Sequence, residues 1–349
     1  MSSIVLIVPG PIETRTGGYE YDRRMAAGLR ARGWSVTIRE LEGAFPHPTK
    51  EDSRRAGEVL AAIPTGAIVL ADGLAFSAIP EEVEREAARL RFAAIVHMPL
   101  AAETGLSAAA ARELENRERR ALAAARLVIV TGRNTTDVVA GYGVSRDRLA
   151  LVEPGVDRAP LAKGRRDPSV VHLVCVATLS PGKGHDILFR ALASIEGRAW
   201  RLTCVGSVDR YPEAIDRLRA ILREHHLEDR VALVGHVDAE GLASAYDSAD
   251  VFVLATLHET YGMAVAEALA HGVPVVSTDT GAIAELVGDE AGIVVPPGNE
   301  RVLAHALSSA MDPRVREKLA EGARRVRDRL MSWDDAVVKM EAALERVGA

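Results

Sequence analysis

The amino-acid sequence predicts an α/β protein with two parallel sheets in two domains. Short apolar runs rich in Val, Ile and Leu alternate with longer stretches of helical periodicity, which is typical of parallel sheets covered by helices. The length of 349 residues suits two hydrophobic cores better than one. Between residues 154 and 169 the chain loses hydrophobic periodicity and carries Pro, Gly and charged residues, so we place the domain boundary there.

The expected strands form two sets, one on each side of this boundary. The first set comprises residues 4–8, 36–38, 68–70, 94–96, 127–130 and 149–152. The second set comprises residues 170–176, 202–205, 231–234, 251–254, 273–277 and 293–295. Stretches such as 19–32, 80–90 and 107–125 are long enough for helices. We therefore expect an N-terminal domain over 1–157, a linker over 158–169, a C-terminal domain over 170–332 and a final helix within 333–349.

Composition argues against several classes of protein. A net charge of -6 and an aromatic content of 4% argue against a nucleic-acid-binding protein. Cys175 and Cys204 lie in apolar runs without the spacing of a disulfide framework or a metal knuckle, which favours a reducing compartment. The sequence shows neither a basic leader nor an apolar stretch of about 18 residues. We expect a cytoplasmic protein, with peripheral contact to anionic membrane lipid as the alternative.

Glu259 and Glu267 form the most informative motif of the chain. Seven residues lie between them. They follow the expected strand 251–254, in a segment that we interpret as a helix with Thr260 as the candidate N-cap and Gly272 at its end. Seven or eight helical residues rise ~10 to 12 Å. That rise matches the separation of the sugar and the ribose in a folded nucleotide-sugar, so we interpret the pair as hydroxyl-binding carboxylates. For a single glutamate, an ordinary place on a helix surface would be the usual interpretation.

A second motif runs from Ser180 to Asp186 and contains Gly-Lys-Gly. It lies between the expected strand 170–176 and a helix with apolar positions from 187 to 195. The N-terminus of a helix attracts phosphate, and Lys183 adds a full positive charge that can neutralise a leaving diphosphate. A simple turn with a solvated lysine is the alternative for this motif taken alone.

The Glu-x7-Glu motif, with the Ala-Leu-Ala-His-Gly-Val-Pro-Val-Val run that follows it, resembles the signature of the retaining glycosyltransferases of family 4. The resemblance implies the GT-B architecture, in which two Rossmann-like domains face each other across a cleft, the first binding the acceptor and the second the donor. It implies that Glu259 contacts the hydroxyls of the donor sugar, that Glu267 holds the ribose and that Lys183 neutralises the diphosphate. The intervening backbone N–H groups, which would face the sugar and the diphosphate, belong to Thr260, Tyr261, Gly262 and Met263.

The resemblance also assigns roles outside these two motifs. The loop with Gly17 and Gly18 would close over the donor, because paired glycines let a backbone approach a ligand closely, although the dinucleotide fingerprint Gly-x-Gly-x-x-Gly is absent. His97 would touch the donor sugar, although a histidine at a strand end is more often structural. The loops expected to bind the nucleobase contain Gly206, Gly235 and His236.

One position departs from the family pattern. Many relatives carry an arginine five residues before the lysine, and this chain has Thr178 there. Arg133, which follows the expected strand 127–130, is our candidate for the compensating cation. The family also places its final helix on the N-terminal domain, which would apply to residues 333–347 of this chain.

The activity that the resemblance implies is transfer of a hexose-type sugar, with retained configuration, from a nucleotide-sugar to an acceptor hydroxyl. UDP- and GDP-sugars are the expected donors, and the acceptor is a small molecule, a glycan or a lipid-linked compound. The sequence has no Asp-x-Asp motif and no metal-ligand spacing, so we expect a metal-independent reaction without a cofactor. Two alternatives remain open, namely a nucleotide-sugar-binding protein without transferase activity and a nucleotide-sugar epimerase.

Overall fold

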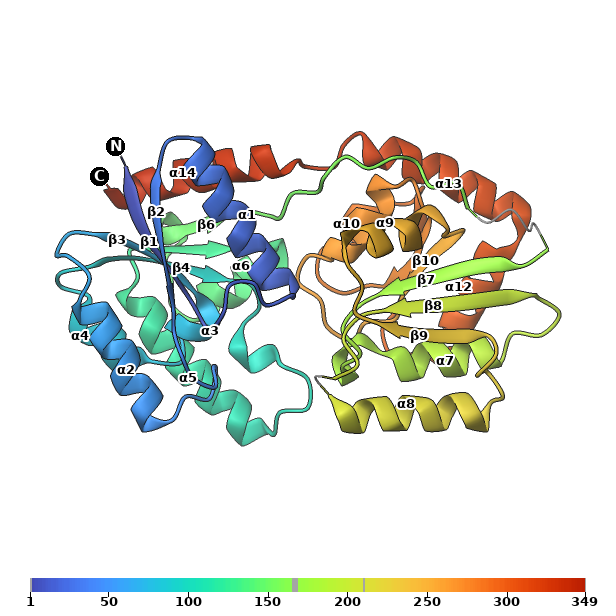
Figure 1. Cartoon of the computed structure of the whole chain (residues 1–349), viewed down its shortest axis with the longest axis horizontal. Helices are drawn as coiled ribbons and strands as arrows, with labels where there is room; N and C mark the ends of the chain where they lie inside the picture. The colour runs from blue at the N-terminus through green and yellow to red at the C-terminus, as the bar shows by residue number, and fades with distance from the viewer. Residues whose placement is uncertain (1, 165–168, 210, 349) are drawn as a thin grey trace. The chain divides into compact units, whose positions relative to one another are not determined.

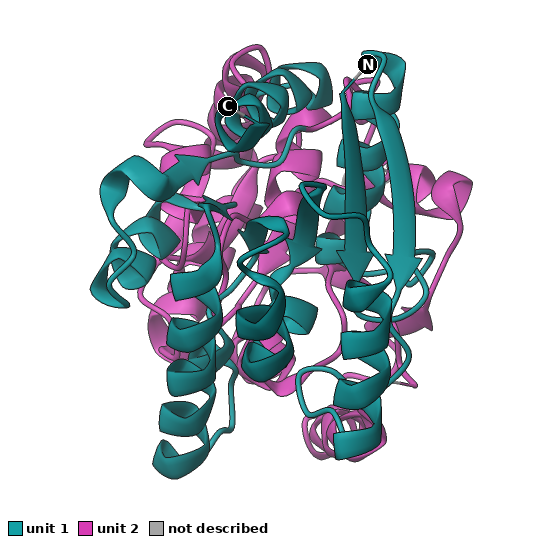
Figure 2. Ribbon diagram, turned by 90° about the vertical axis from the view of Figure 1, so that its left-hand side faces the viewer, with its two compact units in different colours: residues 1–155, 331–349 teal, residues 156–330 magenta. Residues whose placement is uncertain are grey.

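The computed structural model describes residues 2–164, 169–209 and 211–348. These residues form two compact units, which Figure 2 colours separately: residues 1–155 with 331–349, and residues 156–330. Residues 165–168 of the expected linker lie outside the described residues. Each unit contains one six-stranded parallel sheet covered by helices, so the predicted α/β class is confirmed (Figure 1).

The sheet of the first unit has the strand order β2-β1-β3-β4-β5-β6, and all of its pairs are parallel. Its central strands β4 and β5 are buried along nearly their whole length, which explains their continuous apolar sequence. The strands are β1 (Ser3–Val8), β2 (Ser35–Glu40), β3 (Ile68–Asp72), β4 (Arg91–Val96), β5 (Leu127–Val130) and β6 (Leu149–Leu151). The helices are α1 (Gly17–Ala31), α2 (Lys50–Ala61), α3 (Gly73–Phe76), α4 (Pro80–Glu86), α5 (Ala108–Ala124), α6 (Arg133–Gly141) and α14 (Trp333–Gly348), with 3-10 turns η1 (Leu100–Ala102) and η2 (Arg146–Arg148).

The C-terminal helix α14 is part of the first unit. It packs on α1, β4 and β5 through an apolar face that includes Val337 and Met340. Gly28 of α1 leaves the space that Val337 fills, because a Cβ at Gly28 would overlap that side chain. The indole N–H of Trp34 donates to Glu341 Oε1 at 2.9 Å. The C-terminal helix α14 and the N-terminal helix α1 thus belong to the same core.

The sheet of the second unit has the strand order β12-β11-β10-β7-β8-β9 and is also parallel throughout. The strands are β7 (Val171–Val176), β8 (Trp200–Val205), β9 (Val231–Gly235), β10 (Val251–Leu254), β11 (Val275–Thr278) and β12 (Gly292–Val295). The helices are α7 (His185–Ala193), α8 (Pro212–Glu224), α9 (Ala239–Asp247), α10 (Met263–Ala270), α11 (Ile283–Val287), α12 (Glu300–Met311) and α13 (Pro313–Arg327), with the 3-10 turn η3 (Pro181–Lys183).

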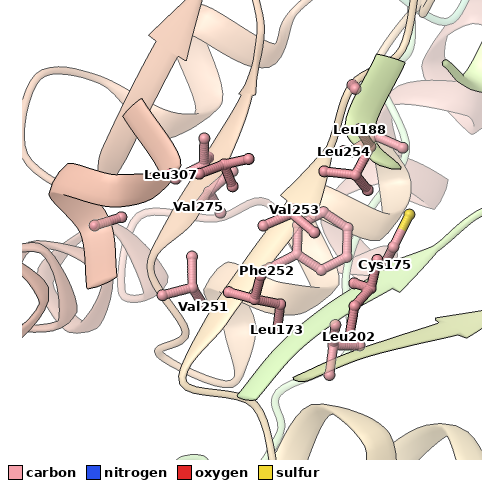
Figure 3. Close-up of a cluster of buried hydrophobic side chains, with 14 of the residues drawn as sticks. Leu173, Cys175, Leu188, Leu202, Val251, Phe252, Val253, Leu254, Val275 and Leu307 are labelled. Atoms are coloured by element: carbon pink, nitrogen blue, oxygen red, sulfur yellow. The ribbon is translucent and has the colours of Figure 1, made fainter. Parts of the chain in front are cut away.

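The core of the second unit lies on both faces of β7 and β10. Figure 3 shows side chains from four neighbouring strands together with Leu188 of α7 and Leu307 of α12 in one buried cluster. Phe252 of β10 is fully buried within this cluster. Because β7 and β10 are direct neighbours and run parallel, the loops that follow them lie at the same edge of the sheet.

Gly322 fixes how closely α13 approaches the rest of its unit. A Cβ at this position would overlap the backbone carbonyl oxygen of Glu290, which no rotamer change can relieve. We predict that Gly322→Ala lowers the free energy of unfolding by about 1 to 3 kcal/mol. Gly141→Ala is the matched control, since Gly141 also lies in a helix but has open space around it, and should be neutral or slightly stabilising. Equal midpoints of urea unfolding for the two variants would contradict this packing argument.

Candidate active site

The loops that follow β7 and β10 are tied together by hydrogen bonds. The carbonyl oxygen of Gly182 accepts from the backbone N–H of Leu257 at 2.8 Å and from the hydroxyl of Thr256 at 3.1 Å. Thr256 is fully buried, so its contact with Gly182 joins the two loops in the interior of the unit. Two segments more than 70 residues apart in sequence are therefore joined directly at the edge of the sheet.

Gly184 ends the Gly-Lys-Gly turn and forms the N-cap of α7. Its φ is +65°, in the left-handed region, and a Cβ there would overlap the carbonyl oxygen of Ala255. Glycine is required for both reasons. This backbone conformation places Lys183 immediately before the N-terminus of α7, as the sequence predicted.

Lys183 and Glu259 form an ion pair. The Lys183 ammonium lies 2.7 Å from Glu259 Oε2, and the two side chains are 28% and 19% exposed. The other carboxylate oxygen, Oε1, accepts the backbone N–H of Thr260 at 3.1 Å. The family resemblance assigned this cation and this carboxylate to neighbouring parts of one ligand, and the structure places them in direct contact.

The predicted start of the helix after Glu259 is wrong. Thr260 does not cap it: α10 begins at Met263, and its N-cap is Gly262 with φ +99°. Residues before Gly262 form a loop, in which the carbonyl of Thr260 accepts the N–H of Ala282 at 3.1 Å. The helical rise estimated between the two glutamates therefore applies only to the part from Met263 onward.

Glu267 lies on α10 and is oriented by Tyr246 of α9. The Tyr246 hydroxyl donates to Glu267 Oε2 at 2.7 Å, and its ring stacks on His271 with centroids 5.0 Å apart. Burial, together with the Glu267 carboxylate, raises the pKa of Tyr246 well above its ordinary value, so the hydroxyl stays a donor. The sequence predicted Glu267 but not the tyrosine that holds it.

The remaining predicted donor residues of the second unit lie at the same edge of the sheet. The N–H of Gly206, after β8, donates to the carbonyl of Gly235 at the end of β9 over 2.9 Å. A Cβ at Gly206 would overlap the carbonyl oxygen of Ala177, so this loop contacts the one that leads to Lys183. His236 follows Gly235 and is exposed. Tyr261 is buried against Ala266 and Ala282, and Met263 is partly buried beside them.

In the first unit, the structure brings Gly18 and His97 together. Gly17 and Gly18 open α1, and an ideal Cβ at Gly18 would lie 3.3 Å from His97 Cδ2. His97 follows β4, and its Nε2 lies 3.3 Å from Asp22 Oδ1 and 3.4 Å from Asp72 Oδ2. Burial alone would lower the pKa of His97, but the two neighbouring carboxylates raise it to about 10.

Sequence reasoning missed the roles of Asp22 and Asp72. Asp22 lies on α1 without a motif, and its carboxylate is fully buried. Burial raises the pKa of Asp22, and the neighbouring His97 opposes that rise. Asp72 ends β3, and this position at the carboxyl end of a parallel strand is the signal that could have indicated it.

Arg133, the candidate compensating cation, begins α6 in the first unit. Its side chain is 58% exposed, and its Nε lies 3.5 Å from Glu153 Oε1. Thr178, at the position where relatives carry arginine, is partly buried, and its carbonyl accepts the N–H of Ser180 at 2.7 Å. The role of Arg133 toward the diphosphate stays a prediction.

Among the described residues, two groups of side chains have the composition of metal sites. One is Asp22, Asp72 and His97, and the other is Cys175, His185 and Cys204; within each group the ligand atoms lie within 4.8 Å of one another. All three members of the second group are buried, and Cys175 Sγ lies 3.6 Å from His185 Nε2. Their members are far apart in sequence, which is why no spacing motif indicated them. Metal independence stays a prediction.

The described helices include none with the length and apolar character needed to cross a lipid bilayer. The strand-end loops of the second unit instead present a cation, a carboxylate and a helix N-terminus at one sheet edge. In α/β proteins with parallel sheets, ligands commonly bind at this edge, and helix N-termini attract phosphate groups.

Residues 171–312 match the family model of the glycosyl transferases group 1. This match lies within the second unit and agrees with the family that the sequence resembles. A D-inositol 3-phosphate glycosyltransferase of Xylanimonas cellulosilytica is 30% identical over 234 residues, or 61% of this chain and 55% of the relative. The chain thus spans about half the length of the curated relatives it matches.

Two solved structures share the fold over almost the whole chain. Sucrose-phosphate synthase from Thermosynechococcus elongatus has a TM-score of 0.85 at 21% identity, covering 99% of this chain and 98% of that chain. HepE of Anabaena, solved in complex with UDP and glucose, has a TM-score of 0.80 at 16% identity, covering 99% of this chain and 100% of that chain. The fold is therefore GT-B-like, as expected.

The loop after His97 is held by Glu118 of α5. The Glu118 carboxylate accepts the N–H of Leu100 at 3.0 Å and is fully buried. Burial raises its pKa from 4.5 to about 7, although the Leu100 N–H opposes that rise. Folding therefore favours the protonated acid, and its contribution to stability is lost as the pH rises from the unfolded value toward the folded one.

We predict that the parent loses free energy of unfolding, on the order of 2–3 kcal/mol, as the pH rises from about 4.5 to 7. The Glu118→Gln variant should not show this loss. Glutamine keeps an acceptor for Leu100 but cannot ionise. Urea unfolding across this pH range measures the difference. Glu113→Gln, an exposed position on the same helix, is the control. A constant difference between parent and Glu118→Gln would show that Glu118 is already ionised in the folded protein.

Proposed function

We propose that this chain is a glycosyltransferase that moves a hexose-type sugar from a nucleoside-diphosphate sugar to an acceptor hydroxyl with retained configuration. The observation that carries the proposal is the ion pair of Lys183 and Glu259 at the strand edge of a group 1 glycosyltransferase segment. A sugar diphosphate carries hydroxyls and an anionic group within a few ångströms of each other. Lys183 can pair with the anionic group, and Glu259 can accept hydrogen bonds from the hydroxyls.

Donor binding would exchange the partners of this ion pair. The diphosphate pairs with Lys183 and lies at the N-terminus of α7, and the sugar hydroxyls donate hydrogen bonds to Glu259. Glu267, oriented by Tyr246, holds the ribose hydroxyls. Glu259 binds and orients the donor and eases positive charge at the anomeric carbon, and is not a general base.

In the transfer step, the bond between the anomeric carbon and the diphosphate oxygen breaks while the acceptor oxygen bonds to the anomeric carbon. The leaving phosphate receives the acceptor proton on the same face, which retains the configuration. Lys183 and the α7 N-terminus stabilise the charge that develops on the leaving diphosphate. The proposed transfer step needs no metal ion. In the proposed complex, His97 contacts the donor sugar.

UDP-sugars are the favoured donors, because HepE, which shares the fold, was solved with UDP and with UDP-glucose. The base would lie on the loops with Gly206, Gly235 and His236. Inositol 3-phosphate is the first acceptor to test, since curated relatives carry the name D-inositol 3-phosphate glycosyltransferase.

A thermal-shift screen against UDP-, GDP-, ADP- and dTDP-sugars tests donor binding. A ligand at a hundred times its Kd stabilises the native state by about 2.7 kcal/mol. We expect the largest rise in Tm with a UDP-sugar. No rise with any nucleotide-sugar would contradict the proposal.

Incubation with labelled donor then separates the activities. Transfer to an acceptor, or slow release of free sugar from the donor, supports a transferase. An epimerised donor formed without acceptor would indicate an epimerase, and tight binding without either reaction would indicate a binding protein.

Substitutions of Glu259 and Glu267 should have different effects on turnover and on donor binding. We predict that Glu259→Gln lowers kcat by at least about a hundredfold without unfolding the protein, because the carboxylate acts near the reacting carbon. Glu267→Ala should chiefly weaken donor binding, since the ribose lies away from that carbon. Steady-state kinetics and calorimetric donor titration measure both effects.

Glu228→Gln is the matched control, because Glu228 is exposed in the same unit. Its kcat and donor affinity should equal those of the parent. Unchanged turnover in Glu259→Gln, or parent-like donor affinity in Glu267→Ala, would refute the role given to that residue.

A further inference from the structure

Cys175, His185 and Cys204 converge in the core of the second unit. Cys175 of β7 and Cys204 of β8 are direct partners in adjacent parallel strands, so their side chains lie on the same face of the sheet. His185 is the first residue of α7, and its Nε2 lies 3.6 Å from Cys175 Sγ. The two sulfur atoms and the imidazole nitrogen lie within 4.8 Å of one another. Three separate elements therefore direct three potential metal ligands to one point.

The surroundings of these three side chains are apolar. Each of the three residues is at most 2% exposed. Figure 3 shows Cys175 in the same buried cluster as Leu188 and Leu254. Among the described residues, the contact with Cys175 is the only hydrogen bond of the His185 ring nitrogens. A thiol is a weak hydrogen-bond partner, so the nitrogen that faces the cysteines is poorly satisfied.

The donor set and its spacing fit a thiophilic metal ion. Thiolate and imidazole ligands suit Zn²⁺ and Cu⁺. Bonds of about 2.3 Å to sulfur and about 2.0 Å to nitrogen, at a tetrahedral angle, place the two ligand atoms about 3.5 Å apart. The 3.6 Å between Cys175 Sγ and His185 Nε2 agrees with that separation. Two thiolates and a neutral imidazole also neutralise Zn²⁺, which suits an apolar core.

We propose that Cys175, His185 and Cys204 bind one thiophilic metal ion, Zn²⁺ or Cu⁺, which fixes the start of α7 to β7 and β8. On binding through both thiolates, the two thiol protons pass to the solvent, and nothing is oxidised or reduced. All three donors are buried, so the ion is structural and separate from the proposed transfer step. The inference concerns one unit only and does not rest on the proposed function.

Because the donors are buried, the ion must enter while the chain folds. The test therefore unfolds the whole protein in urea with a thiol reductant and a chelator, removes the released metal and refolds the chain without oxygen. Separate samples are refolded with Zn²⁺, with Co²⁺ as a spectroscopic substitute for Zn²⁺, and with Cu⁺. Elemental analysis after gel filtration then shows which ions the folded chain retains.

We expect about one retained ion per chain for Zn²⁺ or Cu⁺, and a rise in Tm on the order of 5 °C over the metal-free sample. If Zn²⁺ is the ion, the Co²⁺ sample should show a sulfur-to-cobalt charge-transfer band and the intense visible bands of tetrahedral cobalt. Retention of Cu⁺ alone would assign a three-coordinate copper site instead.

Substitutions connect the bound ion to these ligands. Cys204→Ala and His185→Asn should each weaken metal binding by at least about tenfold, because each removes one ligand. Val174→Ala is the matched control: it removes volume from the same buried core but no metal ligand, so it should still bind one ion. If a ligand variant does not fold, retention and the cobalt spectrum of the parent decide the question.

A parent that refolds but retains none of the three ions would overturn the proposal, and the three side chains would then form only a thiol–imidazole contact in the core. Equal metal binding by Val174→Ala and Cys204→Ala would also overturn it, because the ion would then lie elsewhere. Donor turnover plays no part in these measurements, so this inference and the proposed function fail separately.

Discussion

The ion pair between Lys183 and Glu259 is the contact on which the account of this protein depends. It exists because β7 and β10 are neighbours in a parallel sheet, so that their following loops emerge at one edge. Gly184 allows the first loop to lie against Ala255, and Gly281, with φ +58°, allows another loop to lie against the backbone of Glu259. Each charged group satisfies the other. We propose that a ligand with an anionic and a hydroxyl-rich part replaces both partners.

The same topological rule places charge in the first unit. There, β3 and β4 are neighbours, and the residues at their carboxyl ends, Asp72 and His97, approach each other while Asp22 joins them from α1. In both units, parallel strands bring together charged residues from distant segments at positions where burial strengthens their interaction. The strand order of each sheet therefore determines which of these charged residues meet.

Sequence patterns predicted the strands better than they predicted the contacts between side chains. Each expected strand has a counterpart within a few residues, because buried parallel strands have continuous apolar sequences. The cap at Thr260 was wrong because the left-handed Gly262 delays the helix. Motifs and the family resemblance indicated Lys183, Glu259 and His97 as candidates, and their roles stay predictions. The pairing of Lys183 with Glu259 and the clustering of aspartates around His97 depend on strand order, which no local pattern contains.

A crystal structure of the chain with a bound UDP-sugar tests the central claim most directly. The account predicts that Lys183 Nζ leaves Glu259 and lies at about 2.7–3.1 Å from a diphosphate oxygen, while Glu259 accepts hydrogen bonds from sugar hydroxyls. A complex in which the ligand binds elsewhere and the 2.7 Å ion pair persists would contradict it.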